Sequence, residues 1–203
     1  MQHEPQVYIV DDDAAVRKNL SWLFDSVDIP VVTFSSARDF MDSVSFDRPG
    51  CVLLDVRMPG MSGLELQTRL SDRTDDFPII FISGHGDVNM VVQTMKRGAV
   101  DFIEKPFNNQ AVIDAVQRSI AGIVDAIQAR EHQERARHLL NRLTERERQV
   151  LDGIIDGQTN RQMATELRLS EKTIEVHRSK LMDKMGAKSL VELIKQMATL
   201  ERL

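Results

Sequence analysis

Five polar side chains in the first half of the chain have the types needed to bind and accept a phosphoryl group. Each ends or closely follows a short apolar run: Asp11, Asp12, Asp55, Ser83 and Lys105. Carboxylates that crowd together repel one another unless a cation joins them, and a hard divalent ion that accepts oxygen ligands, with Mg²⁺ as the first candidate, meets that need. A lysine and a hydroxyl group would add positive charge and a hydrogen-bond donor for phosphoryl transfer, in which a carboxylate can be the nucleophile. Taken alone, the acidic cluster at 11–13 is often only a solvated turn, and a lone Lys-Pro pair is weaker evidence still.

The apolar runs that must position these side chains have the length and spacing of strands in a parallel sheet. They cover residues 7–10, 31–34, 51–54, 79–82 and 100–103. Amphipathic stretches leave room for helices at 14–27, 37–44, 62–70 and 88–97, and for another that begins near Gln110. This alternation predicts an α/β fold with a five-stranded parallel sheet and helices on both faces. Because such folds bind ligands at the carboxyl edge of the sheet, Asp12 and Asp55 are expected to meet there.

The helix that begins near Gln110 is predicted to continue beyond the first domain. Its apolar residues recur at intervals of three and four: Ile113, Val116, Ile120, Ile123 and Ile127. This stripe can pack on the sheet or form a heptad-like contact, and the residues alone leave both alternatives open. Because the following segment is charged, we expect a first domain at 1–122, a helical linker at 123–140 and a second domain at 141–203.

Beyond residue 143 the pattern is entirely helical. Thr144 and Glu147 match a capping box for a helix that ends before Gly157. Three further helices are predicted, at 160–167, at 171–185 and after a second capping box at 189–192. Four short helices within about 60 residues predict a compact all-α domain.

The predicted helix at 171–185 carries the candidate contacts to nucleic acid. Val176 is an apolar residue on a polar face, where it could meet a thymine methyl group, with Glu175 and Ser179 near base edges. The side chains expected to reach phosphates or flank the same face are Lys172, Thr173, Arg178, Lys180 and Lys184. A solvated helix on an ordinary bundle explains the pattern equally well. His177 falls on the inward face and is expected to be buried and hydrogen-bonded.

Composition divides the chain in the same way. Residues 1–125 carry 11 basic and 19 acidic side chains, whereas residues 126–203 carry 15 and 12. This asymmetry predicts two domains with different partners. The single cysteine, Cys51, excludes a disulfide framework and a cysteine-based metal site. No apolar run approaches the roughly 20 residues that span a bilayer, so we expect a cytoplasmic protein without a membrane partner.

Four blocks in the first half resemble the signature blocks of receiver domains. They lie at 10–13, 55–63, 83–87 and 105–107, and the resemblance covers about the first 120 residues. It implies a flavodoxin-like fold with Asp55 as the phosphoacceptor. Lys105 would contact the phosphoryl oxygens and precede a cis bond to Pro106. Ser83 and Phe102 match the switch pair, in which the hydroxyl moves to the phosphoryl group and the aromatic ring turns inward.

The same resemblance implies a metal site. Asp12 and Asp55 would bind Mg²⁺ directly, together with the main-chain carbonyl of Arg57. Asp11 would act mainly through water. Mn²⁺ could take the place of Mg²⁺ because it also accepts oxygen ligands.

Two residues near the expected switch could modify its behaviour. Gly84 stands where the family more often has alanine, and it could loosen the switch loop. His85 follows next, near the expected path of an attacking water molecule. We therefore expect His85 to affect the lifetime of the phosphoryl group.

Three blocks in the second half resemble LuxR-type helix-turn-helix domains. They lie at 143–147, 159–164 and 170–178, and with the receiver blocks they make the whole chain similar to the FixJ branch of two-component response regulators. The resemblance implies a scaffold helix at 160–167 and a recognition helix at 171–185. It also implies a dimer contact on the last helix, around four residues that equally suit the domain core: Leu190, Leu193, Ile194 and Met197.

The partners implied by the resemblance are a sensor histidine kinase, double-stranded promoter DNA, RNA polymerase and a second copy of the chain after phosphorylation. The expected function is regulation of transcription, more often activation, with no enzymatic activity beyond slow autodephosphorylation. A phosphatase with an aspartyl nucleophile would need a second carboxylate two positions after Asp55, where this chain has Arg57. An adaptor that binds protein through its C-terminal helices would lack salt-dependent binding to random DNA.

Overall fold

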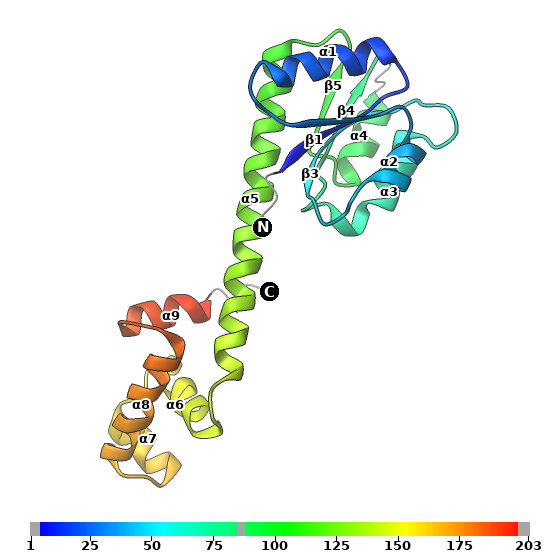
Figure 1. Cartoon of the computed structure of the whole chain (residues 1–203). Helices are drawn as coiled ribbons and strands as arrows, with labels where there is room; N and C mark the ends of the chain where they lie inside the picture. The colour runs from blue at the N-terminus through cyan, green and yellow to red at the C-terminus, as the bar shows by residue number, and fades with distance from the viewer. Residues whose placement is uncertain (1–4, 85–87, 199–203) are drawn as a thin grey trace. The chain divides into compact units, whose positions relative to one another are not determined.

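The computed structural model describes residues 5–84 and 88–198 (Figure 1). The chain forms two compact units, which divide between Ile127 and Gln128. Among the described residues, no helix has both the length and the apolar character needed to cross a bilayer. His85, the residue expected to affect the phosphoryl lifetime, lies outside the described residues.

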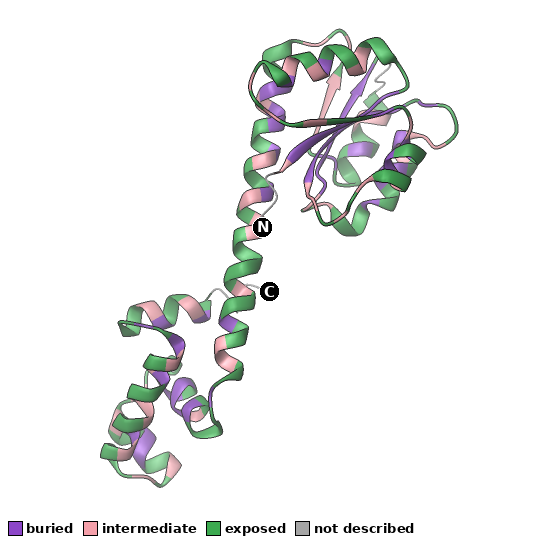
Figure 2. Ribbon diagram, viewed as in Figure 1, coloured by how far each residue is buried: buried purple, intermediate pink, exposed green. Residues whose placement is uncertain are grey.

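The N-terminal unit contains a five-stranded sheet in which every neighbouring pair is parallel. Its strands are β1 (Gln6–Val10), β2 (Val31–Phe34), β3 (Gly50–Asp55), β4 (Ile79–Ser83) and β5 (Asp101–Glu104). Their spatial order, β2-β1-β3-β4-β5, is that of flavodoxin-like folds. All residues of β1, β3 and β4 are buried, as in parallel sheets that helices cover on both faces (Figure 2). The predicted fold class of this unit is confirmed.

Helices cover both faces of this sheet and form two separate cores. The helices are α1 (Ala14–Asp25), α2 (Ala37–Ser43), α3 (Gly63–Arg69), α4 (Val88–Lys96) and α5 (Asn109–Asn141), with a short 3₁₀ helix at Ser71–Arg73. On one face, Phe24 of α1 and Val116 of α5 are fully buried against alternate strand residues. On the other face, Phe40 of α2 and Leu66 of α3 pack against the remaining strand residues, with Met90 of α4 beside them. The alternation of side chains along each strand accounts for the two cores.

Helix α5 is continuous over 33 residues and contributes to both units. Val116 and Ile123 are buried in the N-terminal unit, so the first half of the apolar stripe packs on the sheet. Ala136 is also buried, and Leu139 and Leu140 pack against the core of the C-terminal unit. The end of the segment expected to be a linker therefore belongs to the folded C-terminal unit.

The C-terminal unit contains the four predicted short helices. They are α6 (Glu145–Ile155), α7 (Asn160–Leu167), α8 (Glu171–Met185) and α9 (Leu190–Ala198). Thr144 and Glu147 form the predicted capping box of α6, and Gly186 ends α8 in a left-handed conformation with φ of 64°. The second predicted capping box is only half present. The backbone of Glu192 donates to the Ser189 hydroxyl at 3.2 Å, but the Glu192 carboxylate accepts from Lys188 N at 2.9 Å instead of from Ser189.

Candidate functional site

Three strand ends bring an acidic pair and a lysine together at the carboxyl edge of the sheet. Asp11 follows β1, Asp55 ends β3 and Lys105 follows β5. The Lys105 ammonium lies 2.7 Å from Asp11 Oδ2 and 3.2 Å from Asp55 Oδ1. The sequence correctly placed these residues at one edge, although 94 positions separate Lys105 from Asp11 along the chain.

Backbone groups hold both carboxylates in place. The second oxygen of Asp11 accepts from Asp13 N at 2.8 Å, and the second oxygen of Asp55 accepts from Arg57 N at 2.8 Å. Arg17 on α1 donates to the main-chain oxygen of Asp11 at 2.7 Å. Asp11 and Asp55 are only 2% and 7% exposed, so their orientation depends on these few donors.

Gly63 allows the loop after β3 to fold back on Asp55. Its N–H donates to the main-chain oxygen of Val56 at 3.0 Å. A Cβ atom at this position would collide with the main-chain oxygen of Asp55. The sequence block contained Gly63, but only the structure shows that its missing side chain sets the position of the Asp55 backbone.

The charges at this edge are unbalanced. Burial raises the pKa of Asp55; Lys105 and the Arg57 N–H oppose this rise, whereas the nearby Asp11 charge adds to it. Burial alone would lower the pKa of Lys105, but its contacts with Asp11 and Asp55 outweigh burial and raise it. The single ammonium group of Lys105 therefore contacts two carboxylates, and the exposed Asp12 follows Asp11 as a third acid.

The remaining expected residues surround this cluster. Ser83 is 2% exposed at the end of β4, and its main-chain oxygen accepts from Lys105 N at 2.9 Å. Phe102 is half-buried on β5, with its ring centre 6.3 Å from that of Phe81. The bond from Lys105 to Pro106 is cis, as the family resemblance implied.

The donor set suits a hard divalent cation. Among the described residues, no three acidic, histidine or cysteine side chains form a ready-made metal cage. The available donors at the edge are carboxylate and main-chain oxygens, which Mg²⁺ accepts together with water. The excess of negative charge over the Lys105 ammonium gives the same preference for an added cation.

In the C-terminal unit, α8 presents the predicted surface. Ile174, Leu181 and Met185 are buried in the core, as expected for its inward face. Val176 is 47% exposed, in agreement with its place on the outer face. The outer or flanking residues that are also exposed are Lys172, Glu175, Ser179 and Lys180. His177 is only half-buried, which corrects the expectation that it is a buried histidine.

Lys184 has a structural contact that the sequence did not reveal. Its ammonium lies 2.6 Å from Glu147 Oε2 and 3.2 Å from the main-chain oxygen of Arg142. Glu147 is 2% exposed and also accepts from Thr144 N at 2.8 Å. Burial by itself would raise the pKa of Glu147, but the bonds from Lys184 and Thr144 lower it to about 2. The buried Glu147 carboxylate competes with a DNA phosphate for this ammonium group, and the assignment of Lys184 to a phosphate stays a prediction.

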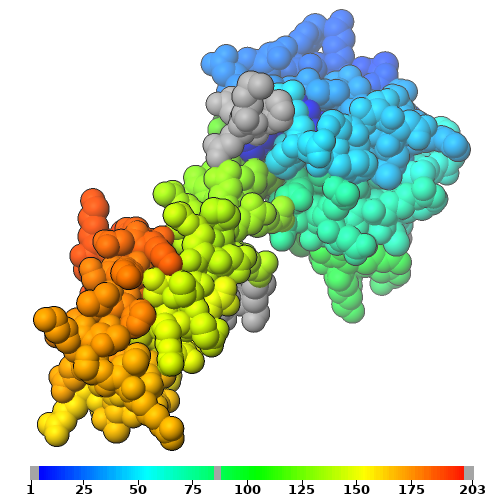
Figure 3. Space-filling model, turned by 60° about the horizontal axis from the view of Figure 1, so that its bottom comes forward, coloured from blue at the N-terminus to red at the C-terminus, as the bar shows by residue number. Residues whose placement is uncertain are grey.

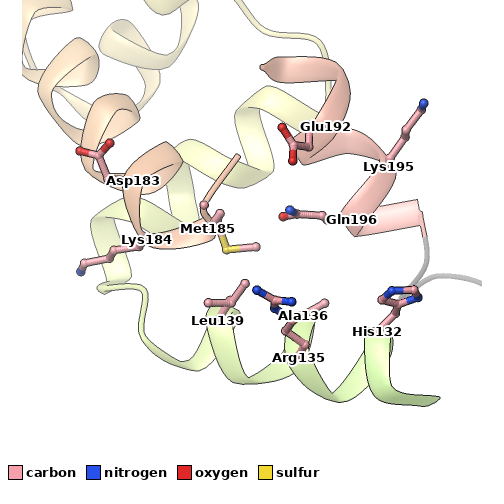
Figure 4. A pocket seen from close by; sticks show the side chains of 11 residues that line it. His132, Arg135, Ala136, Leu139, Asp183, Lys184, Met185, Glu192, Lys195 and Gln196 are labelled. Carbon is pink, nitrogen blue, oxygen red and sulfur yellow. The ribbon is translucent and has the colours of Figure 1, made fainter. Parts of the chain in front are cut away.

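A cavity of about 500 Å³ lies within the C-terminal unit, between the ends of α5 and α8 and the side of α9 (Figure 4). Ala136 and Leu139 of α5 lie on one side, and Met185 and Gln196 face them. In Figure 3 the yellow-green atoms of α5 adjoin the orange and red atoms of α8 and α9. No sequence motif indicated this cavity.

Comparison with known proteins agrees with this architecture. Residues 7–117 match the response regulator receiver domain, and residues 141–197 match the bacterial regulatory proteins of the luxR family. The chain is 40% identical over 195 residues to the transcriptional regulatory protein FixJ of Bradyrhizobium diazoefficiens, with coverage of 96% of this chain and 95% of that protein. The chain is a two-component response regulator of the FixJ branch.

Other relatives extend the similarity of this response regulator. The transcriptional regulatory protein TdiR of Thauera aromatica is 43% identical over 190 residues, which cover 93% of this chain and 83% of TdiR. The solved structure of the response regulator StyR has a TM-score of 0.84 and 42% identity, with coverage of 96% and 98% of the two chains. The family has a LuxR-type DNA-binding domain and consists of transcription regulators, not enzymes.

Proposed function

We propose that phosphorylation of Asp55 by a sensor histidine kinase controls DNA binding by this response regulator. The observation that carries the proposal is the position of the buried Asp55 carboxylate, 3.2 Å from the Lys105 ammonium. An Asp55 oxygen would attack the phosphorus of a phosphohistidine, and the bond from phosphorus to the imidazole nitrogen would break. The Lys105 ammonium would then stabilise the added phosphoryl oxygens.

The same edge would hold Mg²⁺, with Mn²⁺ as an alternative. Asp12, Asp55 and the main-chain carbonyl of Arg57 would bind it directly, and Asp11 would act mainly through water. When bound, the ion would neutralise charge on the phosphoryl group. Asp11 also orients Lys105 through their 2.7 Å contact, so its function extends beyond the metal.

Ser83 and Phe102 would connect the phosphoryl group to the surface around α4 and β5. The Ser83 hydroxyl would move to the phosphoryl group, and the half-buried Phe102 ring would turn inward. This surface already exposes apolar side chains on or next to α4 and β5: Val88, Val92, Met95 and Val100. An exposed apolar patch suits a symmetric contact with a second copy of the chain.

Dimerisation would place two α8 helices on half-sites about one helical turn apart. Glu175, Val176 and Ser179 would face base edges. The phosphate contacts would come from Lys172, Thr173, Arg178 and Lys180. Leu193 and Met197 belong to the domain core, so a contact through α9 would instead use its exposed residues: Leu190, Val191 and Ile194.

For these roles we assign a receiver domain to 1–122 and a DNA-binding domain to 141–203. A helical linker at 123–140 joins them, and its last turns pack on the core of the C-terminal unit. Activation of transcription by contact with RNA polymerase is proposed by analogy with the family. Because its proposed partners are promoter DNA and a kinase that supplies phosphoryl groups, the protein would act in the cytoplasm.

The direct test incubates the protein with acetyl phosphate and Mg²⁺ and measures phosphorylation by mobility in a phosphate-binding gel. We expect the wild type to be modified and an Asp55→Asn variant to remain unmodified. Asp72→Asn, at an exposed site, is the matched control and should be modified like the wild type. Equal modification of Asp55→Asn and the wild type would refute the proposal. Binding of random duplex DNA at several salt concentrations tests the C-terminal function, because phosphate contacts give a steep salt dependence.

A further inference from the structure

The side chain of Arg178 is oriented by a residue from the other helix of the helix-turn-helix pair. Arg178 lies in the middle of α8, and its Nη1 donates to Asn160 Oδ1 at 3.0 Å. Asn160 is the first residue of α7. Both side chains are half-buried, so the contact restrains the guanidinium group near the surface of the domain.

The neutral partner leaves the charge of Arg178 intact. Lys184, on the same helix, is bound to the carboxylate of Glu147, which weakens its attraction for a further anion. Asn160 offers only an amide oxygen, and a guanidinium group has five N–H donors. Arg178 is therefore fixed in orientation while most of its donors and its full charge stay available.

A fixed guanidinium group differs from the other basic side chains of α8. Lys172 and Lys180 are exposed, and their ammonium groups act as point charges on flexible chains. A planar guanidinium can bind phosphate through two parallel hydrogen bonds, provided that its plane is correctly turned. Restraint before binding also reduces the entropy that the side chain loses in the complex.

From this contact we infer that Asn160 is a positioning residue for DNA binding, which presents Arg178 to a backbone phosphate of double-stranded DNA. The inference rests on the proposed function, in which α8 binds DNA. It assigns to Asn160 an effect that acts through Arg178 and not through a DNA contact of its own.

A double-mutant cycle with Asn160→Ala and Arg178→Met tests this coupling. Binding of a mixed-sequence DNA duplex is measured by fluorescence anisotropy at several salt concentrations, because a phosphate contact needs no specific sequence. We expect Arg178→Met to weaken binding about tenfold and to reduce the salt slope by about 1. Asn160→Ala should weaken binding about threefold in the wild type and leave the Arg178→Met variant unchanged, since loss of orientation costs less than loss of the contact.

An Asn160→Asp variant separates a positioning role from a purely structural one. The carboxylate keeps the hydrogen-bond acceptor but neutralises Arg178, so DNA binding should fall below that of Asn160→Ala. A merely structural role predicts that Asn160→Asp weakens DNA binding no more than an equivalent negative charge placed elsewhere on α7. Gln162→Glu is the control for added negative charge on α7, because it preserves the acceptor that caps the helix. It should weaken binding less than Asn160→Asp.

The outcomes distinguish this inference from the proposed function. If the wild type fails to bind duplex DNA, the DNA-binding function itself is refuted. If the wild type binds but Asn160→Ala has the same cost in both backgrounds, only the positioning role is refuted. An Arg178→Met variant that binds like the wild type also overturns the inference. Circular dichroism must show unchanged helix content and thermal unfolding for each variant, and a variant that fails this control is replaced by Asn160→Ser.

Discussion

Each unit of this response regulator buries a carboxylate against a lysine, but the two pairs differ in their balance of charge. In the N-terminal unit, Lys105 contacts both Asp11 and Asp55. In the C-terminal unit, Lys184 contacts the single carboxylate of Glu147. The pKa of Asp55 is raised by burial despite Lys105, whereas Lys184 and Thr144 outweigh burial and lower the pKa of Glu147 to about 2.

This difference separates a structural ion pair from a site that still needs a ligand. The Glu147 carboxylate has a backbone donor and a full positive charge, so a further ligand would add little. The edge that holds Asp11 and Asp55 has fewer positive than negative charges, and an added cation would relieve their repulsion. Buried ionisable groups whose charges are not fully neutralised by their neighbours are typical of functional sites. A carboxylate that is paired with one cation and fully hydrogen-bonded is typical of a structural contact in a folded core.

The largest effect is expected when the balanced pair, in which Lys184 contacts the single carboxylate of Glu147, is broken. Lys184→Met should destabilise the C-terminal unit by about 3 kcal/mol, because Glu147 would remain buried without its cation. Urea unfolding followed by circular dichroism at 222 nm measures the change. Lys180→Met removes an exposed lysine from the same helix and should leave the unfolding midpoint unchanged. Equal midpoints for Lys184→Met and Lys180→Met would show that the pair contributes little.

Breaking the unbalanced pair, in which Lys105 contacts both Asp11 and Asp55, should change the chemistry of phosphorylation as well as stability, because these carboxylates are also buried. Lys105→Met should slow phosphorylation by acetyl phosphate about 100-fold, because it removes a charge that stabilises the transferred group. It should also strengthen Mg²⁺ binding, because Lys105 competes with the metal for Asp11 and Asp55. Gel analysis measures the first effect and calorimetric titration of Mg²⁺ the second. Lys96→Met, at an exposed site on α4, is the control. Weaker Mg²⁺ binding by Lys105→Met would contradict the charge argument.

The position of the unbalanced site, which Asp11, Asp55 and Lys105 form, was predictable from the sequence because each residue lies at or just after the end of a strand. Polar residues at the ends of parallel strands must lie at one edge, whatever the details of the loops. The sequence could not tell which of two adjacent acids would be buried. The loop after β1 decides this, since Asp13 caps α1 through Ala15 N at 2.7 Å and donates its own N–H to Asp11. Asp11 consequently contacts Lys105, and Asp12 is exposed.

The balanced pair was not predictable in the same way. A helical wheel shows only which residues share a face of α8 with Lys184. Its partner Glu147 lies 37 positions away, in α6. Glu147 was expected only to cap α6, which it does with one oxygen that also binds Lys184. The contribution of α5 to the second core was missed for a related reason. Leu139 and Leu140 follow a charged segment, and only the packing of the helices shows that they belong to the next unit.

Lowering the pH should change the stability of the two units in opposite directions. The folded pKa of Glu147 is lowered from 4.5 to about 2, so its stabilising effect is present above about pH 4.5 and disappears as the pH falls toward 2. The folded pKa of Asp55 is raised above 3.8, so the stability of its unit decreases as the pH rises from 3.8 through the folded pKa. At pH 7, Asp55→Asn should therefore stabilise the N-terminal unit, whereas Glu147→Gln should destabilise the C-terminal unit.

Different probes follow these two pH effects in the intact chain. Fluorescence of Trp22, the single tryptophan, reports on the N-terminal unit, and circular dichroism reports on total helix content. Urea midpoints are compared at pH 7 and at pH values near each transition. Asp72→Asn and Asp152→Asn are the controls, because each removes one exposed negative charge from the corresponding unit. A lower midpoint for Asp55→Asn at pH 7 would oppose the proposed effect of burial on Asp55.

The smallest effect is expected from Gly84→Ala, which changes the loop after β4 without changing any charge. A Cβ atom at Gly84 would meet no described atom within 4 Å, and its φ lies outside the left-handed region. Alanine should therefore stabilise the N-terminal unit by about 0.5 kcal/mol by restricting the unfolded chain. Gly63→Ala is the contrasting variant, because its Cβ would collide with the Asp55 backbone and should be destabilising. Urea midpoints from Trp22 fluorescence measure both changes, and a lower midpoint for Gly84→Ala would mean that this loop requires glycine.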